Sequence, residues 1–282
     1  MLIRATLEDV EKYGDFIYEI ALDRTKCAYP VYGDGIKTKT DFLADAGRAA
    51  AQENEELLLF VSDEKVMGWL SFFWIPKEHY LQLTACNVDG DVQQALGELL
   101  ALLESRFRGY QLYFGFPGDN EDAIQFLKKN GFFCIEDAWN HSFFFENAKI
   151  GPEDGSTARI ERENYSDFRA VYRPDESTYW NCDRILESLD EWIIYVAYRN
   201  GVAAGGIFLR GEEGSYEIFG TGFLNDTYEE TVHRTLLGAA PNACSRRSAK
   251  YLTYFCGEQE RMVAAEVGFV CVGRYVCYMK GI

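Results

Sequence analysis

Apolar residues follow two spacings along this chain, and the alternation between them predicts a mixture of strands and helices. In residues 56–73, two apolar runs flank the polar segment 62–65, as in two strands joined by a tight turn. In residues 92–107, leucines recur at the spacing of one helix face. Further strands are expected at 2–5, 79–86 and 111–116, and further helices at 7–22 and 39–51.

A capped helix between two strands is predicted after residue 111. Asp119 or Asn120 can cap this helix, and Gly131 can end it. The residues on its apolar face are Ala123, Phe126 and Leu127. A helix that joins two strands in this way implies a parallel pair. Residues 134–135 and 142–145 are then expected to finish this half of the chain as a hairpin.

The same order of elements starts again in the second half. Strands are expected at 158–161, 192–197, 203–209, 215–224, 251–255 and 268–272, and helices at 165–172 and 227–239. Matching positions keep a nearly constant distance: Gly131 and Gly268 lie 137 residues apart, and Asn87 and Asn225 lie 138 apart. The pattern therefore predicts an internal duplication.

The length of 282 residues fits two domains of about 130 to 150 residues each. Residues 146–157 are polar and contain Gly and Pro, which is the composition of a linker. We therefore predict an N-terminal domain at 1–147, a linker at 148–157 and a C-terminal domain at 158–282.

The net charge of -17 argues against nucleic acid as a partner, because phosphate binding requires clustered Lys and Arg. An acidic surface could attract a cationic amine, or it could simply keep the protein soluble. No basic segment followed by an apolar stretch opens the chain, and no run of about 18 uncharged apolar residues occurs. We expect a cytoplasmic protein that does not bind membranes.

The cysteines and histidines give no sign of a metal site. The eight cysteines include no Cys-x-x-Cys pair and mostly lie in apolar, strand-like runs, as expected for reduced cysteines of a core. The three histidines are widely separated and lack the spacing of zinc ligands. The expected cofactors therefore include no metal.

The order Asn-x-x-Ala-Ile-x-Phe-x-x-Lys-x-Gly-Phe, from Asn120 to Phe132, resembles the acyl-CoA-binding segment of the GNAT (GCN5-related N-acetyltransferase) superfamily. The predicted order of elements resembles the GNAT fold twice over. The resemblance implies an α/β (α+β) chain of two tandem GNAT-like domains. Each would be a mixed, mostly antiparallel sheet with flanking helices, in which a central parallel strand pair is splayed and can hold the pantetheine arm of acetyl-CoA.

The resemblance also implies which residues would contact acetyl-CoA. In the first half these are Asn87, Gly90 and Asn120, and in the second half Asn225 and Thr227. The family's phosphate loop, Gln or Arg-x-x-Gly-x-Gly or Ala, is degenerate here. Asp89 and Asp91 flank Gly90, and residues 225–230 contain no glycine. Such acidic residues weaken anion binding unless they are screened, but they are also ordinary helix caps.

For catalysis, Glu217 resembles the strand glutamate that acts as a base in histone-acetylating members of the family. It could equally be a solvent-facing strand residue, and the matching first-half residue, His79, could simply begin a strand. Many members carry a tyrosine that protonates the leaving thiolate. Leu127 and Ala264 stand at that position here.

Aromatic residues in two loops are candidates for binding the acceptor: Tyr29, Tyr32, Tyr179 and Trp180. Packing would explain them equally well. The sequence therefore predicts an N-acetyltransferase that transfers an acetyl group from acetyl-CoA to a small amine. The alternatives are a non-catalytic GNAT-like binding protein, or one working half supported by the other. The acceptor and the oligomeric state stay open.

Overall fold

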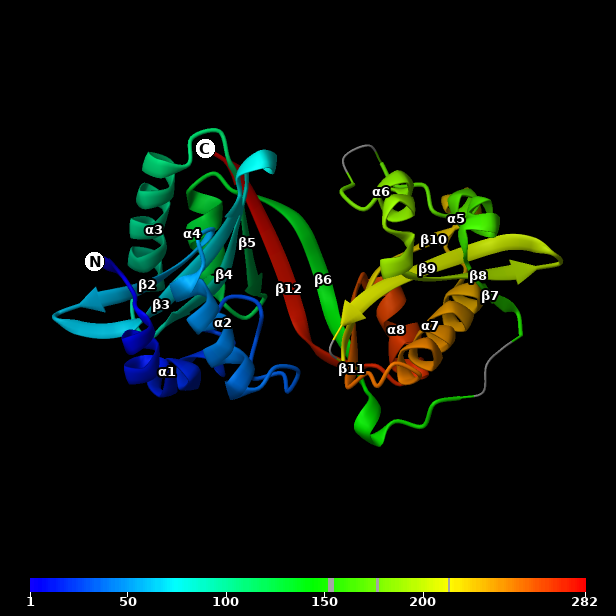
Figure 1. The fold of residues 1–282 in the computed structure, drawn as a ribbon, viewed down its shortest axis with the longest axis horizontal. Coiled ribbons are helices and arrows are strands. Elements are labelled where there is room, and N and C mark those ends of the chain that lie inside the picture. Colours follow the sequence, from blue (N-terminus) through cyan, green and yellow to red (C-terminus); the bar gives the residue numbers. More distant parts are fainter. Residues whose placement is uncertain (152–154, 176–177, 213) are drawn as a thin grey trace. The chain divides into compact units, whose positions relative to one another are not determined.

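The computed structural model describes residues 1–151, 155–175, 178–212 and 214–282. These residues form two compact units. The first contains Met1–Ala138 together with Gly273–Ile282, and the second contains Trp139–Val272. Each unit is a mixed sheet with helices on both faces (Figure 1). The predicted fold class is therefore confirmed.

In the first unit, six strands lie in the order β1-β2-β3-β4-β5-β12. Helices α3 and α4 cover one face of the sheet, and α1 and α2 cover the other. Side chains alternate along the strands, so that Leu58 and Phe60 pack under the first helix pair and Leu57 and Leu59 under the second. The bounds are β1 Leu2–Arg4, α1 Leu7–Ala21, α2 Lys39–Ala51, β2 Glu55–Ser62, β3 Lys65–Ile75, β4 Tyr80–Val88, α3 Val92–Arg106, β5 Gln111–Pro117, α4 Glu121–Lys129 and β12 Val270–Gly281.

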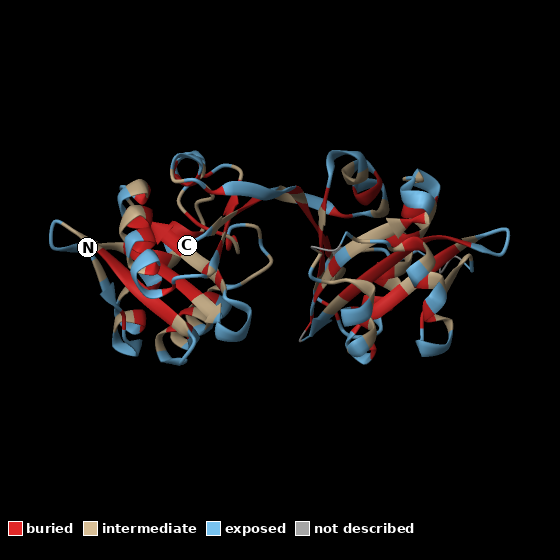
Figure 2. Ribbon diagram, turned by 90° about the horizontal axis from the view of Figure 1, so that it is seen from above, coloured by how far each residue is buried: buried red, intermediate tan, exposed pale blue. Residues whose placement is uncertain are grey.

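In the second unit, the strand order is β6-β11-β10-β9-β8-β7. Helices α7 and α8 cover one face, and α5 and α6 cover the other. Figure 2 shows the buried strands of each unit in red beneath helices whose outer faces are exposed. The bounds are β6 Phe133–Phe144, β7 Thr157–Arg159, α5 Tyr165–Val171, α6 Cys182–Glu187, β8 Ile193–Arg199, β9 Val202–Glu212, β10 Ser215–Phe223, α7 Glu230–Ser245, β11 Tyr251–Cys256 and α8 Glu258–Val267.

The last strand of each half completes the sheet of the other half. β12, at the end of the chain, pairs antiparallel with β5 from Tyr275 to Gly281. β6, from the middle of the chain, pairs antiparallel with β11 from Trp139 to Phe144. The boundary between the units therefore falls inside β6, and the compact units do not coincide with the predicted domains 1–147 and 158–282.

The predicted hairpin at 134–135 and 142–145 is wrong, because residues 133–144 form the single strand β6. Asn140 and His141, between the two predicted strands, do not form a turn but pair with Phe255 and Tyr254 of β11. Residues 136–141 also contain no Gly or Pro, which a tight turn would favour. Part of the predicted linker 148–157, namely 152–154, lies outside the described residues.

The predicted helices at 7–22, 39–51 and 92–107 begin where the structure has the starts of α1, α2 and α3, and side-chain caps are found at several helix starts. Thr6 and Thr38 form capping boxes with Asp9 and Asp41 at the starts of α1 and α2. Asn120 caps α4 by accepting a hydrogen bond from the Ala123 N–H. Helix α6 was not predicted, although Asn181 caps it by accepting hydrogen bonds from the backbone of Asp183 and Arg184.

In each unit a parallel strand pair separates along its length. β4 and β5 pair only from Tyr80 and Gln111 to Gln82 and Tyr113, although both strands continue. β10 and β11 pair from Ser215 and Tyr251 to Ile218 and Tyr254, and β10 then continues to Phe223. The predicted splayed strand pair is therefore present in both sheets.

The eight cysteines are free thiols. Five of them are buried: Cys27, Cys86, Cys244, Cys256 and Cys277. Placement in the core was wrong for Cys134 and Cys271, which are exposed on β6 and β12.

Candidate functional site

A cleft opens in the second unit where β10 and β11 separate. The last parallel pair is Ile218 with Tyr254, and beyond it lies an open pocket of about 410 Å³. We call this pocket the second-unit cleft. It is lined by the end of β10, by the loop before α7 and by the first turn of α8: Thr221, Gly222, Phe223, Asp226, Tyr228, Gly257, Glu258, Gln259 and Glu260.

The second-unit cleft lies at the N-terminus of a helix. The first backbone N–H groups of α8, those of Glu258 and Gln259, cannot have partners within their own helix. The Gly257 N–H is engaged, because it donates a hydrogen bond to the Glu260 carboxylate at 2.8 Å. A helix N-terminus of this kind favours an anion through its free donors and its dipole.

Most of the carboxylates at the starts of α7 and α8 are paired with cations. Glu229 lies 2.6 Å from Arg199, Glu230 lies 2.7 Å from Arg234, and Glu258 lies 3.1 Å from Arg261. These exposed pairs contribute little stability, but each arginine offsets the charge of its partner. Among these three carboxylates, Glu258 lines the cleft, together with Asp226 and Glu260.

The corresponding gap in the first unit is bridged by the chain itself, through residues 26–29, which we call the bridging segment. On the β4 side, the Ala28 N–H donates to the Cys86 carbonyl at 2.9 Å, and the Val88 N–H donates to the Lys26 carbonyl at 3.2 Å. On the β5 side, the Tyr29 N–H donates to the Gly115 carbonyl at 2.9 Å. The backbone groups that splaying exposes are thus satisfied internally.

Asn120, predicted to contact acetyl-CoA, instead holds the bridging segment. Its side chain is fully buried, donates to the Cys27 carbonyl at 3.0 Å and accepts from the Ala123 N–H at 3.2 Å. This position leaves no exposed atom of Asn120 for a ligand. A second open pocket of about 460 Å³, which we call the first-unit pocket, remains outside the bridging segment; it is lined by Thr25, Lys26, Val88, Gly90, Val92, Asp119, Glu121 and Asp122.

The other predicted cofactor contacts are divided between the units. Gly90 lines the first-unit pocket with φ +135°. Asn87 does not line it; Asn87 is buried, and its side-chain nitrogen has no hydrogen-bond partner among the described residues. Asp89 is paired with Lys26 at 2.7 Å, and Asp91 caps α3. Asn225 and Thr227 flank Asp226, which lines the second-unit cleft, and the Thr227 hydroxyl donates to the Asn225 carbonyl.

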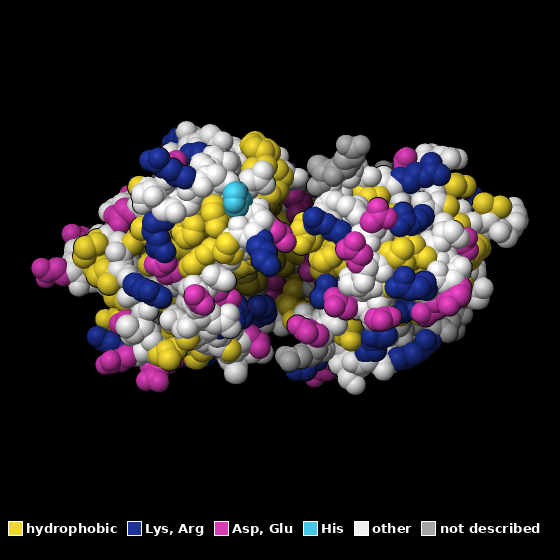
Figure 3. Space-filling view, turned by 45° about the horizontal axis from the view of Figure 1, so that its top comes forward, with side chains coloured by type: hydrophobic (Ala, Val, Ile, Leu, Met, Phe, Trp, Pro, Cys, Tyr) yellow, Lys and Arg dark blue, Asp and Glu magenta, His cyan; other side chains and the backbone are white. Residues whose placement is uncertain are grey.

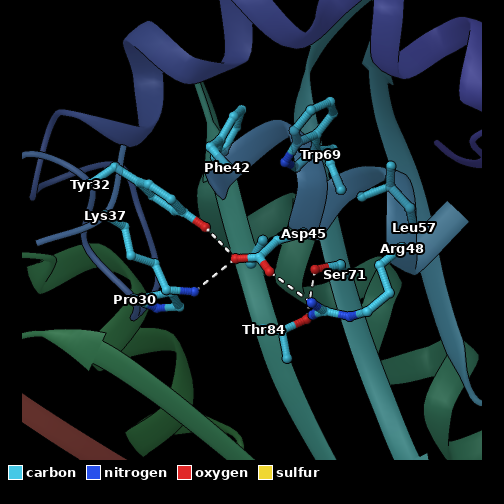
Figure 4. A pocket seen from close by; sticks show the side chains of 12 residues that line it. Pro30, Tyr32, Lys37, Phe42, Asp45, Arg48, Leu57, Trp69, Ser71 and Thr84 are labelled. Atoms are coloured by element: carbon cyan, nitrogen blue, oxygen red, sulfur yellow. Dashed lines mark hydrogen bonds and ion pairs between the residues drawn. The ribbon is translucent and has the colours of Figure 1, made fainter. Parts of the chain in front are cut away.

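The two predicted acceptor residues of the first half do not line one pocket. Tyr29 packs against Tyr275, with ring centroids 4.8 Å apart. Tyr32 lines a separate pocket of about 100 Å³, where its hydroxyl donates to Asp45 at 3.0 Å (Figure 4). Asp45 also accepts from Lys37 and Arg48, each at 2.8 Å. The polar wall of this small pocket is therefore already paired internally.

In the second unit, Trp180 and Glu217 belong to one face of the sheet. Trp180 packs against Trp192 and Phe219, with ring centroids 4.9 and 6.2 Å away. Glu217 lies directly opposite Arg210 of β9, whose guanidinium lies over both tryptophan rings. Directly opposed residues of antiparallel strands share a face. The predicted base and Trp180 are therefore on the same side of the sheet.

Tyr179 is about half exposed next to Trp180, and its ring lies 4.1 Å from the Arg184 guanidinium. Residues 176–177 of the same loop lie outside the described residues. His79, the first-half counterpart of the base, is not in a strand. It ends a short turn in a left-handed conformation and stacks on Tyr110.

None of the predicted site residues lines the second-unit cleft, although Asn225 and Thr227 flank Asp226, which does. The duplication contained a usable signal, because Gly257 of the second half occupies the cap position that Asn120 has in the first half. Sequence reasoning also missed three hydrogen-bonded side chains at the cleft: Tyr228, which is partly exposed and lines it, and the buried His233 and Tyr254. Their spacing of 5 and 21 residues along the chain forms no motif.

Charges of both signs are interspersed over the visible face of each unit (Figure 3). None of the helices in the described parts of the chain is both long enough and apolar enough to cross a bilayer.

Two sheets with splayed parallel strands and helices on both faces define a tandem protein of the GNAT fold, and solved structures bear this out. The chain is similar to a GCN5-related N-acetyltransferase from Sphaerobacter thermophilus, with a TM-score of 0.65, 13% identity, and coverage of 100% of this chain and 96% of that one. It is also similar to a tandem GNAT protein from the clavulanic acid biosynthesis pathway, with a TM-score of 0.54, 12% identity, and coverage of 99% and 98%.

A glucosamine N-acetyltransferase region of a fungal multi-domain GH3 β-N-acetylglucosaminidase gives a TM-score of 0.58 at 14% identity, and this chain covers 38% of its length. No protein-family model matches the sequence, and no curated protein matches it. At these identities the similarity concerns the fold, and the GNAT resemblance is confirmed at that level.

Proposed function

We propose that this protein is an N-acetyltransferase that binds acetyl-CoA in the second-unit cleft and transfers the acetyl group to the amine of a small molecule. The observation that carries the proposal is the difference between the two gaps. The first gap is bridged by residues 26–29, whereas an open pocket begins where the β10–β11 pairing ends. The first unit would then act as a supporting domain.

The second-unit cleft suits two parts of acetyl-CoA: the pantetheine arm, which has peptide-like amide groups, and the anionic pyrophosphate. Thr221, Gly222 and Phe223 line it beyond the last parallel pair, and their backbone groups that are not paired with β9 would bond the pantetheine arm. The first N–H groups of α8 would favour the pyrophosphate. Acetyl-CoA supplies an activated thioester, and the protein supplies position and proton transfer.

The acceptor amine would approach from the face that carries Trp180 and Glu217. Glu217 would take the amine proton directly or through water, as a general base. Trp180 presents an aromatic surface suited to an apolar or cationic group. Tyr179, half exposed beside it, would contact the same acceptor.

Binding of acetyl-CoA to the full chain, measured by isothermal titration calorimetry, tests the assignment of the cleft. Gln259 and Asp122 occupy the second position of α8 and of α4, and each lines the pocket of its own unit. A tryptophan at either position would fill that pocket. We expect Gln259→Trp to weaken acetyl-CoA binding by about tenfold or more and Asp122→Trp to leave it unchanged.

The reverse pattern would place the cofactor in the first unit and refute the assignment. A full chain that takes up no acetyl-CoA at millimolar concentration would instead favour a non-catalytic GNAT-like protein.

Replacing the proposed base provides a kinetic test. We expect Glu217→Gln to lower the turnover number at neutral pH by about tenfold or more, because the amide cannot accept the amine proton. Thiol release from acetyl-CoA, in the presence of an amino sugar, an amino acid and a polyamine, measures the rate. Glu212→Gln, an exposed carboxylate at the end of β9, is the matched control. Equal rates for Glu217→Gln and the control would remove Glu217 from the mechanism.

A further inference from the structure

A chain of hydrogen-bonded side chains lies beside the second-unit cleft. The Tyr228 hydroxyl lies 3.2 Å from Nδ1 of His233, and Nε2 of His233 lies 3.1 Å from the Tyr254 hydroxyl. His233 is fully buried, and burial lowers its pKa to about 4. A neutral imidazole has one N–H and one lone pair, so it accepts a proton on one side as it donates on the other.

Tyr228 and Tyr254, the two ends of this row of hydrogen-bonded side chains, are buried to different degrees. Tyr228 is partly exposed and lines the second-unit cleft. Tyr254 is buried and belongs to the last parallel pair, at the point where β10 and β11 begin to separate. Burial raises the pKa of Tyr254, and so does the nearby carboxylate of Glu260, which lines the cleft. These hydrogen-bonded side chains therefore run from the wall of the cleft to the position where β10 and β11 separate.

The first unit has apolar residues at the matching positions. His233 is the fourth residue of α7, and the fourth residue of α3 is Ala95. Tyr254 is the fourth residue of β11, and the fourth residue of β5 is Phe114; both are buried. Both Ala95 and Phe114 belong to the apolar core of the first unit. Apolar residues thus suffice for packing in this fold, and the buried polar groups of the second unit need another explanation.

We propose that Tyr228, His233 and Tyr254 form a proton relay that delivers a proton to the leaving thiolate at the inner end of the second-unit cleft, with Tyr254 as the donor. This inference rests on the proposed function. It supplies the general acid whose usual position is occupied by Ala264.

The relay balances protons as follows. The bond between the amine nitrogen and the acyl carbon forms, the carbon–sulfur bond breaks, and Glu217 takes one proton from the amine. Tyr254 gives its proton to sulfur and regains one from Nε2–H of His233. The Tyr228 hydroxyl gives its proton to Nδ1, and water at the mouth of the cleft restores Tyr228. Because His233 changes tautomer and does not become cationic, burial does not oppose the transfer.

The relay is tested on the full chain by NMR with ¹⁵N-labelled histidine, because only three histidines are present. His233→Gln identifies the His233 signals. In the wild type we expect one protonated and one bare ring nitrogen from pH 5 to 8, and we expect saturating coenzyme A to shift both signals. Tyr254→Phe should abolish the response of the Nε2 signal to coenzyme A.

Kinetics provide the second measurement. We expect Tyr254→Phe and His233→Gln to lower thiol release from acetyl-CoA by about tenfold or more, with the acetyl-CoA dissociation constant within twofold of wild type. Tyr198→Phe is the matched control, because it also removes one hydroxyl from this unit, where Tyr198 donates to Asp167. The control should retain the wild-type rate.

The outcomes separate the two proposals. A wild-type chain that does not bind acetyl-CoA contradicts the proposed function and the relay together. If acetyl-CoA binds, the relay alone is refuted when coenzyme A leaves the His233 signals unmoved, or when Tyr254→Phe turns over as fast as Tyr198→Phe.

Discussion

Deleting Gly273–Ile282 is expected to unfold the first unit, although these ten residues lie at the far end of the chain from it. β12 pairs with β5 from Tyr275 to Gly281, and its side chains Val276 and Tyr278 are part of the first unit's core. Burying an apolar side chain stabilises a protein by about 1.5 to 3 kcal/mol. The free energy of unfolding of a typical domain is roughly 5 to 15 kcal/mol. Losing two such side chains, together with the hydrogen bonds between β12 and β5, would remove much of it.

Hydrogen–deuterium exchange of the amides in β4 and β5 would measure this effect. We expect fast exchange in the truncated chain and slow exchange in the full chain. Deleting Ile282 alone serves as the control, because it leaves every paired residue of β12 in place. A synthetic peptide of residues 270–282 should restore protection when it is added to the truncated chain. Slow exchange in β4 and β5 without the peptide would contradict the prediction.

The exchange of final strands also determines how function can be tested. A fragment of residues 1–147 would keep β6 but lack β12, so that β5 would have an unpaired edge. A fragment of residues 158–282 would lack β6, the partner of β11. Separately expressed halves would therefore expose unpaired strands, which favour aggregation. For this reason the binding experiments use the full chain with matched substitutions in each unit.

Most elements were predictable because their signals are local. The helical spacing of leucines placed α3, and the cap at Asp119 or Asn120 placed the start of α4. No local signal predicts that β6 pairs with β11 of the second half and that β12 pairs with β5 of the first half. β6 and β12 are equally long and follow matching helices, so either could pair with β5 by its pattern alone. Pairing partners depend on the three-dimensional path of the chain, which alternation of side chains does not encode.

The candidate site residues follow from the family pattern, but that pattern does not show how the chain itself fills the gap of the first unit. Asn120 and Gly90 match the family pattern best, which favoured the first half for acetyl-CoA. The bridging segment fills that gap through backbone hydrogen bonds of Lys26, Ala28 and Tyr29. Because every residue type has the same backbone carbonyl and nearly every type the same N–H, the sequence contains no signal for these bonds. The buried Asn120 amide completes this arrangement. A residue type that suits a ligand can thus serve the chain's own backbone, and sequence alone does not distinguish the two.

Gly68→Ala is expected to destabilise the first unit strongly, by about 3 kcal/mol or more, through a backbone contact that the sequence does not reveal. Gly68 lies in β3 with φ +154°, opposite an irregularity in β2. A Cβ atom at this position would lie 1.9 Å from the Asn87 carbonyl oxygen and 2.8 Å from the Val88 Cα. Both are backbone atoms of the neighbouring strand β4, so β3 and β4 would have to move apart.

Gly109→Ala is the control that shows how much backbone strain alone costs, without a steric contact like that of residue 68 with β4. Gly109 has φ +85°, and a Cβ atom at this position would have no described atom within 4 Å, so its substitution should cost only the strain of about 1 kcal/mol. Urea unfolding of both variants gives the comparison, with tryptophan fluorescence following the first unit through Trp69 and Trp74. Because Trp69 pairs with Asn87 next to Gly68, its signal reports the same strand contact. Equal midpoints for the two variants would mean that β3 and β4 can separate at little cost, and the steric reason given for Gly68 would then be wrong.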